Sequence, residues 1–188
     1  MLTNSDIPPP ASQVRLIERE PIPSSPTKVY QTLPKLNPEA RILHIDYVWA
    51  PKARLRYWDD ELAEGPAEIG IVHTGYGLPD AQSIENYGES LGVKTTFTYV
   101  AQPGDLSRIG LELVKFLDRV SAEEGQVVVC VDSLSLMLQY ASGDTAMNFF
   151  TELYNKLEYY DALGRIYFTP LAHSQQMVES IRAELTNS

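Results

Sequence analysis

Short apolar segments alternate with amphipathic ones from residue 40 to the end of the chain. Five of the apolar segments have the length and the β-branched content of strands: 40–48, 67–73, 95–100, 126–131 and 165–169. Continuous apolar runs such as 126–131 are typical of parallel strands that are buried on both faces. The pattern predicts an α/β fold, a three-layer sandwich around a mostly parallel central sheet.

Apolar residues recur at helical spacing between these strands. Helices are expected at 52–64, 81–91, 106–120 and 144–161, and a last one passes through Gln176, Ile181 and Leu185. The helix at 106–120 has the best-marked ends, because Asp105 can cap its start and Gly125 follows its end. The segment between Ser133 and Gly143 is expected to be a linker. Strands and helices in this order are joined by right-handed crossovers.

The N-terminal fifth has a different composition. Eight of the thirteen prolines lie in the first 38 residues, and the first glycine is Gly65. We therefore divide the chain into a proline-rich arm, residues 1–26, and a single α/β domain, residues 27–188. Within this region Gln13–Glu18 is predicted to form a strand and Thr27–Lys35 a short helix.

The charge balance bears on the possible partners. The chain has 25 acidic and 15 basic residues, a formal charge of -10 and a pI of about 4.7. Such a surface repels nucleic acid and anionic membranes, so neither is expected as a partner. No apolar run is long enough to span a bilayer, and the N-terminus lacks the pattern of a secretory signal. A cytoplasmic location is the expectation.

In open parallel sheets, ligands bind at the carboxyl ends of the strands, so residues at these ends are the candidates for chemistry. Asp132 and Ser133 end the apolar strand at 126–131. A carboxylate in this position can hold the Mg²⁺ of a bound nucleotide. In the alternative interpretation, both side chains only accept backbone hydrogen bonds in the turn that follows the strand.

The three histidines are too dispersed for their spacing to encode a metal site, and none is predicted. His44 lies within a strand, where a structural, hydrogen-bonded role is expected. His73 and His173 lie near the carboxyl ends of strands. Together with Asp46 and Thr169, they are candidates to line a pocket at that edge of the sheet.

Three segments resemble the second half of RecA-superfamily domains, especially the KaiC-like ATPases: 127–134, the helix from Asp144 with Phe149 and Phe150, and 165–169. Residues 131–140 and 168–173 are also similar to an uncharacterised haloarchaeal family of RecA-like domains that lacks the phosphate-binding glycine loop. An acidic composition with nine arginines and six lysines agrees with that similarity. The resemblance implies a RecA-like central sheet.

The chain departs from this pattern where ATPases bind their substrate. The resemblance places the phosphate-binding loop between Gln13–Glu18 and the helix from Thr27, where Pro21, Pro23 and Pro26 stand. Proline has no N–H group to offer a phosphate. The resemblance places the catalytic glutamate after the strand at 41–48, where the sequence reads Trp49-Ala50-Pro51. Loss of ATP hydrolysis is predicted, with no cofactor required.

These observations leave several functions open. The first is a regulatory or scaffold domain that binds a protein partner or forms a homo-oligomer. The alternative is a divergent ATPase or sensor in which Asp132, Ser133 and Lys28 bind Mg-ATP. A further option is a small-molecule sensor with a pocket around His73, Asp132 and His173.

The aromatic residues bear on the first of these functions. Tyr57 and Trp58 are adjacent, so one helix face cannot direct both into the core, and Tyr159 lies off the apolar stripe of its helix. We expect Trp58 in the core with the tyrosines at its rim. Exposed aromatic residues are the alternative, because they are enriched at protein interfaces.

Overall fold

The computed structural model describes residues 14–20, 36, 38–61, 66–75, 77 and 79–186. The predicted helix Thr27–Lys35, and with it the candidate Lys28, lies outside the described residues.

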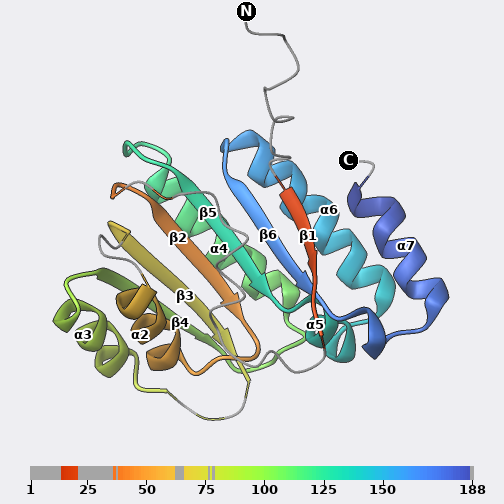
Figure 1. Cartoon of the computed structure of the whole chain (residues 1–188), viewed down its shortest axis with the longest axis horizontal. Helices are drawn as coiled ribbons and strands as arrows, with labels where there is room; N and C mark the ends of the chain where they lie inside the picture. Colours follow the sequence, from red (N-terminus) through yellow and green to blue (C-terminus); the bar gives the residue numbers. More distant parts are fainter. Residues whose placement is uncertain are drawn as a thin grey trace, which may run out of the picture.

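The described strands form one six-stranded sheet in the order β1-β6-β5-β2-β3-β4 (Figure 1). Each neighbouring pair is parallel. The strands are β1 (Val14–Glu18), β2 (Arg41–Asp46), β3 (Glu68–Thr74), β4 (Lys94–Val100), β5 (Val127–Asp132) and β6 (Leu163–Phe168). The predicted parallel sheet is confirmed, and the fold is RecA-like. β1 lies within the predicted proline-rich arm, so that segment contributes a strand to the sheet.

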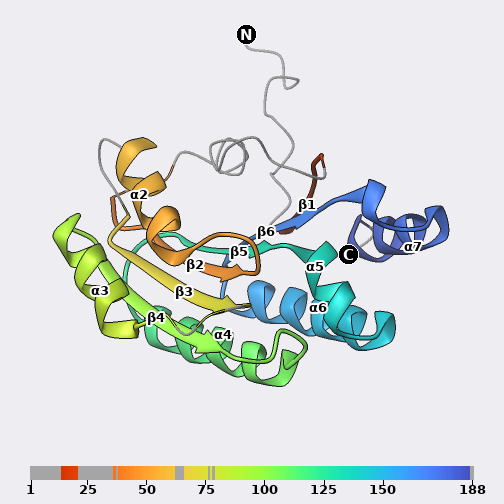
Figure 2. The same ribbon diagram turned by 90° about the horizontal axis from the view of Figure 1, so that it is seen from below.

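Helices cover both faces of the sheet (Figure 2). On one face lie α2 (Pro51–Glu61) and α3 (Ala81–Ser90), and on the other α4 (Leu106–Val120) and α6 (Gly143–Tyr159). The remaining helices are α5 (Leu134–Tyr140), the 3₁₀ turn η1 (Pro170–Ala172) and α7 (Gln175–Thr186), which contacts β1. Within the described residues, no helix is both long and apolar enough to cross a membrane.

α4 shows how a local pattern becomes packing. The Asp105 side chain accepts a hydrogen bond from the Arg108 backbone N–H at 3.0 Å, which confirms the predicted cap. The helix then buries one stripe against the sheet: Leu106, Ile109, Leu113, Phe116, Leu117 and Val120. Full burial of one such side chain contributes about 2 kcal/mol. The chain turns back into β5 at Gly125, whose φ of +119° suits glycine.

Two expectations were wrong. The expected linker after Ser133 contains α5, which is capped by the Ser133 side chain and buries Leu134 and Met137. Tyr57 is not at the rim of the core, because it is buried beside Trp58 in the cluster between α2, α3 and the sheet. The prediction assumed that a side chain of α2 can be buried only on the face toward the sheet. α3 also packs against α2, so a second face of α2 is buried. Tyr159 is 80% exposed, as its place off the stripe predicted.

The strand order reverses between β2 and β5. From β2 the chain continues outward to β3 and β4, then returns to the other side of β2 and continues through β5 to β6. Ligands of open α/β sheets bind at such a reversal, outside the carboxyl ends of the strands. β2 and β5 end in register there, with Asp46 opposite Asp132.

His44 makes the stability of this fold depend on pH. Its Nε2 accepts a hydrogen bond from Trp58 Nε1 at 3.0 Å, and burial lowers the pKa of His44 well below 6.5. The unfolded chain therefore binds a proton that the folded chain excludes. We expect the free energy of unfolding to fall below about pH 6.5, by up to roughly 1.4 kcal/mol per pH unit for this group.

Urea denaturation followed by tryptophan fluorescence, between about pH 7.5 and 5.5, measures this dependence. His44→Gln should reduce the slope clearly. The control, His173→Gln, changes a half-buried histidine and should reduce it less. An unchanged slope in His44→Gln would contradict the assignment.

Candidate functional site

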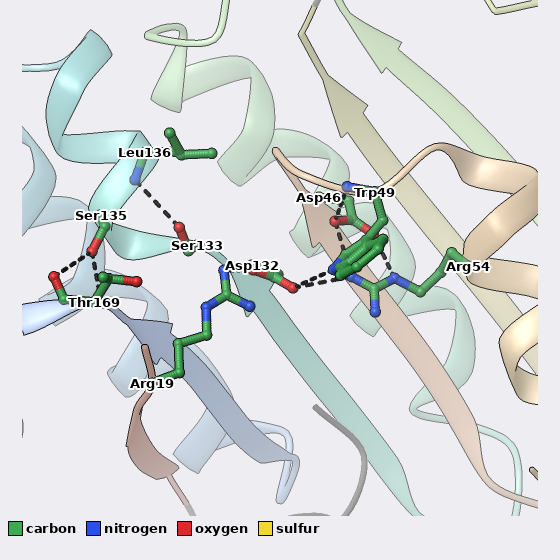
Figure 3. Close-up of polar contacts among 9 residues, drawn as sticks. All are labelled: Arg19, Asp46, Trp49, Arg54, Asp132, Ser133, Ser135, Leu136 and Thr169. Carbon is green, nitrogen blue, oxygen red and sulfur yellow. Dashed lines mark hydrogen bonds and ion pairs between the residues drawn. The ribbon is translucent and has the colours of Figure 1, made fainter. Parts of the chain in front are cut away.

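Asp132 ends β5, and its carboxylate is buried and fully engaged (Figure 3). Arg19 forms an ion pair with Oδ1. Oδ2 accepts hydrogen bonds from Trp49 Nε1 at 3.0 Å and from Arg54 Nη2 at 3.2 Å. Both oxygens of the candidate magnesium ligand are thus bound by side chains of the same chain.

Asp46, the last residue of β2, is 0% exposed and shares one of these partners. Arg54 Nε binds Asp46 Oδ2 at 2.6 Å, and Arg54 Nη2 binds Oδ1 at 3.0 Å. The Trp49 backbone N–H donates to Oδ1 at 3.3 Å. Arg54 therefore links the carboxylates that end two adjacent strands.

The resulting cluster of Arg19, Asp46, Arg54 and Asp132 is balanced, with two positive and two negative side chains. We call it the four-charge cluster. Burial, the largest influence on Asp46, raises the pKa of its carboxyl group, and the Arg54 guanidinium acts in the opposite direction. Each charge is stabilised mainly by its opposite neighbours, because little water reaches the cluster.

Two short connections bring the cluster together. Arg19 follows β1 directly, and its backbone N–H donates to the Phe168 carbonyl at 2.8 Å. Its guanidinium lies over the Tyr167 ring, 5.6 Å from the centroid. Arg54 lies in the first turn of α2, close to the end of β2. The end of β1, where the family resemblance places phosphate binding, thus holds a cation that binds Asp132.

Sequence reasoning missed Arg19, Trp49 and Arg54. One signal could have found Arg54, since it lies four residues before Trp58 and shares the face of α2 that meets the sheet. A charged residue on a buried face needs a buried partner. Two carboxylates at the nearest strand ends were available to provide one.

The hydroxyl groups near Asp132 hold the backbone. Ser133 Oγ caps α5 by accepting the Leu136 backbone N–H at 3.3 Å. Ser135 Oγ accepts the Thr169 backbone N–H at 2.8 Å, which ties α5 to the end of β6. The peptide bond between Asp132 and Ser133 is cis. Ser133 and Thr169 thus lie beside the cluster in positions that fix the turns after β5 and β6.

The structure separates the histidines that the sequence placed at the strand ends. His73 lies in β3, in register with Asp46, whereas His173 follows β6 and stacks on Phe168 at 5.2 Å. β2 and β5 lie between these positions in the sheet. Two strands, each about 4.8 Å wide, thus separate His73 from His173 in the sheet. Asp46, Asp132 and His73 lie on three consecutive strands.

A cleft with a volume of about 570 Å³ lies at the carboxyl ends of β2 and β3. The loops after β2, β3 and β4 and the end of α5 form it, and its lining includes Tyr47, His73, Thr74, Pro103 and Tyr140. We call it the strand-end cleft. Within the described residues, no group of three or more His, Cys, Asp or Glu side chains is placed to hold a metal ion.

Comparisons with known proteins give a family and a set of distant structural likenesses. A model described as "Family of unknown function (DUF7504)" matches residues 31–184. No curated protein matches the sequence.

Three solved structures are similar at low identity. The flagellar accessory protein FlaH from Methanocaldococcus jannaschii is 14% identical, with a TM-score of 0.40 over 80% of this chain and 70% of that one. The uncharacterized protein PH0321 from Pyrococcus horikoshii, in complex with an unknown peptide, is 10% identical, with a TM-score of 0.37. The match covers 85% of this chain and 80% of that one. The U34-tRNA thiolase NcsA from Methanococcus maripaludis is 14% identical, with a TM-score of 0.35. The match covers 85% of this chain and 62% of that one.

Asp132→Asn tests whether the carboxylate belongs to the buried ion pairs. The substitution keeps an oxygen for Trp49 but leaves Arg19 without an opposite charge, while Arg54 retains Asp46. We expect the free energy of unfolding to fall by about 3 kcal/mol in urea denaturation. Asp59→Asn, at an exposed position, should change it by less than about 0.5 kcal/mol.

The double variant Asp132→Asn with Arg19→Met removes one charge of each sign and should recover part of the loss. A neutral or stabilising effect of Asp132→Asn alone would contradict the ion-pair assignment. It would indicate a carboxylate left in uncompensated negative surroundings.

Proposed function

We propose that this chain, which belongs to the family of unknown function DUF7504, is a non-catalytic RecA-like domain that acts by binding a protein, a second copy of itself. The four-charge cluster carries the first half of the proposal. Asp132, the residue best placed to hold a nucleotide-bound Mg²⁺, is already paired with Arg19 and Arg54.

A metal ion would have to compete with these internal partners. Release of Arg19 from Asp132 would leave a largely buried charge without compensation, at a cost of about 3 to 5 kcal/mol for a broken pair, whereas Arg54 would keep Asp46. The prolines at 21, 23 and 26 also remove N–H groups from the segment where phosphate binding is implied. Both features favour a domain that has kept the RecA-like sheet without the ATPase reaction.

The edge strand β1 supports the second half of the proposal. Among the described strands it is the last one on its side of the sheet, and α7 packs against it. Edge strands readily add a strand from another chain. Two copies paired about a two-fold axis normal to the sheet would place Leu16 opposite Leu16 of the second copy, and Arg15 opposite its Ile17. Glu18 takes no part in this pairing, because Arg182 of the same chain binds its carboxylate at 2.6 and 2.8 Å.

An exposed apolar side chain follows the strand next to β1. Leu171, in η1, is 82% exposed and lies three residues after Phe168, which pairs with Glu18 in the β1–β6 register. An exposed leucine is apolar surface that a contact between two chains can bury. We include Leu171 in the proposed interface.

Calorimetric titration with Mg-ATP and Mg-ADP tests the non-catalytic assignment. Because the Asp132 carboxylate is occupied, we expect no binding with a dissociation constant below about 1 mM. We also expect Mg²⁺ to leave the melting temperature unchanged at matched ionic strength. Sub-millimolar Mg-ATP binding that Asp132→Ala abolishes would favour the nucleotide-binding alternative.

Sedimentation velocity over a concentration series up to about 100 µM tests self-association. Leu16→Glu would place two like charges opposite each other at the two-fold axis, so the dimer should weaken several-fold. The matched control Lys156→Glu reverses an exposed charge on α6 and should have no effect.

A monomer at every concentration would contradict the homodimer, as would equal weakening by Leu16→Glu and Lys156→Glu. Deletion of residues 1–25 is a less suitable test, because it removes β1 and Arg19 together with the rest of the segment.

A further inference from the structure

We infer that the groove between α4 and β4 is a docking site for an extended acidic segment of a partner protein, with an apolar residue between two acidic ones. We call it the α4–β4 groove. Among the described strands, β4 is the last one on the side of the sheet opposite β1, so this surface is separate from the proposed dimer contact. The inference stands on observations that the proposed function does not use.

The groove lies where α4 crosses the last strands of the sheet (Figure 2). The buried side chains of Leu43, Val72 and Phe116 line its interior, and the half-buried Thr96 and Thr98 line its β4 side. Its volume is about 140 Å³. Small-molecule pockets usually exceed roughly 300 Å³, so this groove suits single side chains of a larger partner.

The exposed charges at one end of the groove are positive. Lys94 Nζ and Arg119 Nη1 both bind the Glu68 carboxylate, at 2.9 and 2.8 Å. The Glu68 side chain is 1% exposed, whereas those of Lys94 and Arg119 are 59% and 38% exposed. One buried negative charge is therefore shared by two positive charges that remain accessible.

The same arrangement occurs about two turns earlier on α4. Glu112 binds both Arg108 and Lys115 at 3.0 Å. The Glu112 side chain is 10% exposed, whereas its two partners are 49% and 56% exposed. Four cations against two carboxylates leave a surplus of two positive charges at the groove. On a chain with a formal charge of -10, this surface is locally complementary to an acidic segment.

Leu111 gives the same surface an apolar contact. It is 46% exposed, and on α4 it lies three residues after Arg108 and four residues before Lys115. Side chains at these spacings are neighbours on a helix, so Leu111 lies beside the cations. An apolar side chain of the partner, placed between its acidic residues, would bury Leu111 and the interior of the groove.

The spacing of the charges favours an extended segment. Glu112 and Arg119 are seven residues apart on α4, which separates the two positive centres by about 10 Å. Acidic residues four positions apart in an extended chain lie about 13 Å apart on one side, with one further side chain between them. Flexible lysine and arginine side chains can bridge the difference. A helix, about 10 Å wide, is too large for a groove of this volume.

The edge of β4 favours binding through side chains over addition of a strand. The Glu85 carboxylate of α3 accepts a hydrogen bond from the Phe97 backbone N–H of β4 at 3.2 Å. An added strand would have to break this bond, because it would use the same edge of β4. A segment bound on the α4 side of the sheet leaves the bond intact.

Three blocked pentapeptides test the chemistry: Asp-Ser-Leu-Ser-Asp, Asn-Ser-Leu-Ser-Asn and Asp-Ser-Ser-Ser-Asp. The second lacks the charges and the third lacks the apolar residue. ¹H–¹⁵N correlation spectra of the full chain at matched ionic strength would report binding at the amides of Thr96 and Arg119. We expect a dissociation constant of roughly 1 mM for the first peptide and binding weaker by about fivefold or more for the other two.

Matched variants locate the site. Lys115→Glu reverses an exposed charge, and Thr98→Phe fills the groove, so each should weaken binding of Asp-Ser-Leu-Ser-Asp by about fivefold or more. Lys52→Glu reverses an exposed charge on α2, on the other face of the sheet, and should have no effect. Sedimentation of each variant shows separately whether the homodimer persists, so failure of this inference and failure of the proposed function are distinguishable.

Four results would overturn the inference. The first is the absence of binding by Asp-Ser-Leu-Ser-Asp up to about 10 mM. The second is equal binding of the acidic peptide and its Asn counterpart. The third is unchanged binding in Lys115→Glu or in Thr98→Phe, which would place the peptide elsewhere on the molecule. The fourth is tighter binding of a single-stranded oligothymidine at the same amides, which would assign the surface to nucleic acid.

Discussion

Two buried carboxylates end adjacent strands of this protein, and Arg54 allows them to coexist. Asp46 and Asp132 lie in register on strands about 4.8 Å apart, where two uncompensated negative charges would oppose folding. Arg54 binds both from α2, and Arg19 binds Asp132 from the end of β1. The positions of α2 and β1 relative to the centre of the sheet are therefore coupled to one electrostatic balance.

That balance gives a physical reason for the function we propose. In an open α/β sheet the crevice at the reversal of strand order is the usual place for a ligand. Here the guanidinium groups of Arg19 and Arg54 bind the carboxylates at the ends of β2 and β5. A cluster whose charges balance within the chain offers no surplus charge to a phosphate or a metal ion. The surface that we propose for self-recognition is the β1 edge.

Much of the fold could be predicted because it rests on local patterns. Apolar runs such as 126–131 identified the strands of the sheet, and Asp105 identified the start of α4, since strand burial and helix capping depend on residues close in sequence. α5 was missed because it is short and begins directly after a strand, so its seven residues show little periodicity. Tyr57 was misplaced because its burial depends on α3, which covers α2 from the side.

The sequence by itself determined the alternation of strands and helices, the acidic charge and the importance of Asp132 at a strand end. Only the tertiary structure decided what Asp132 does, because its partner Arg19 is 113 residues away along the chain. The strand order likewise separated His73 from His173 and joined Thr74 to Tyr140. Such contacts depend on which strands become neighbours, and no local pattern of side chains encodes that order.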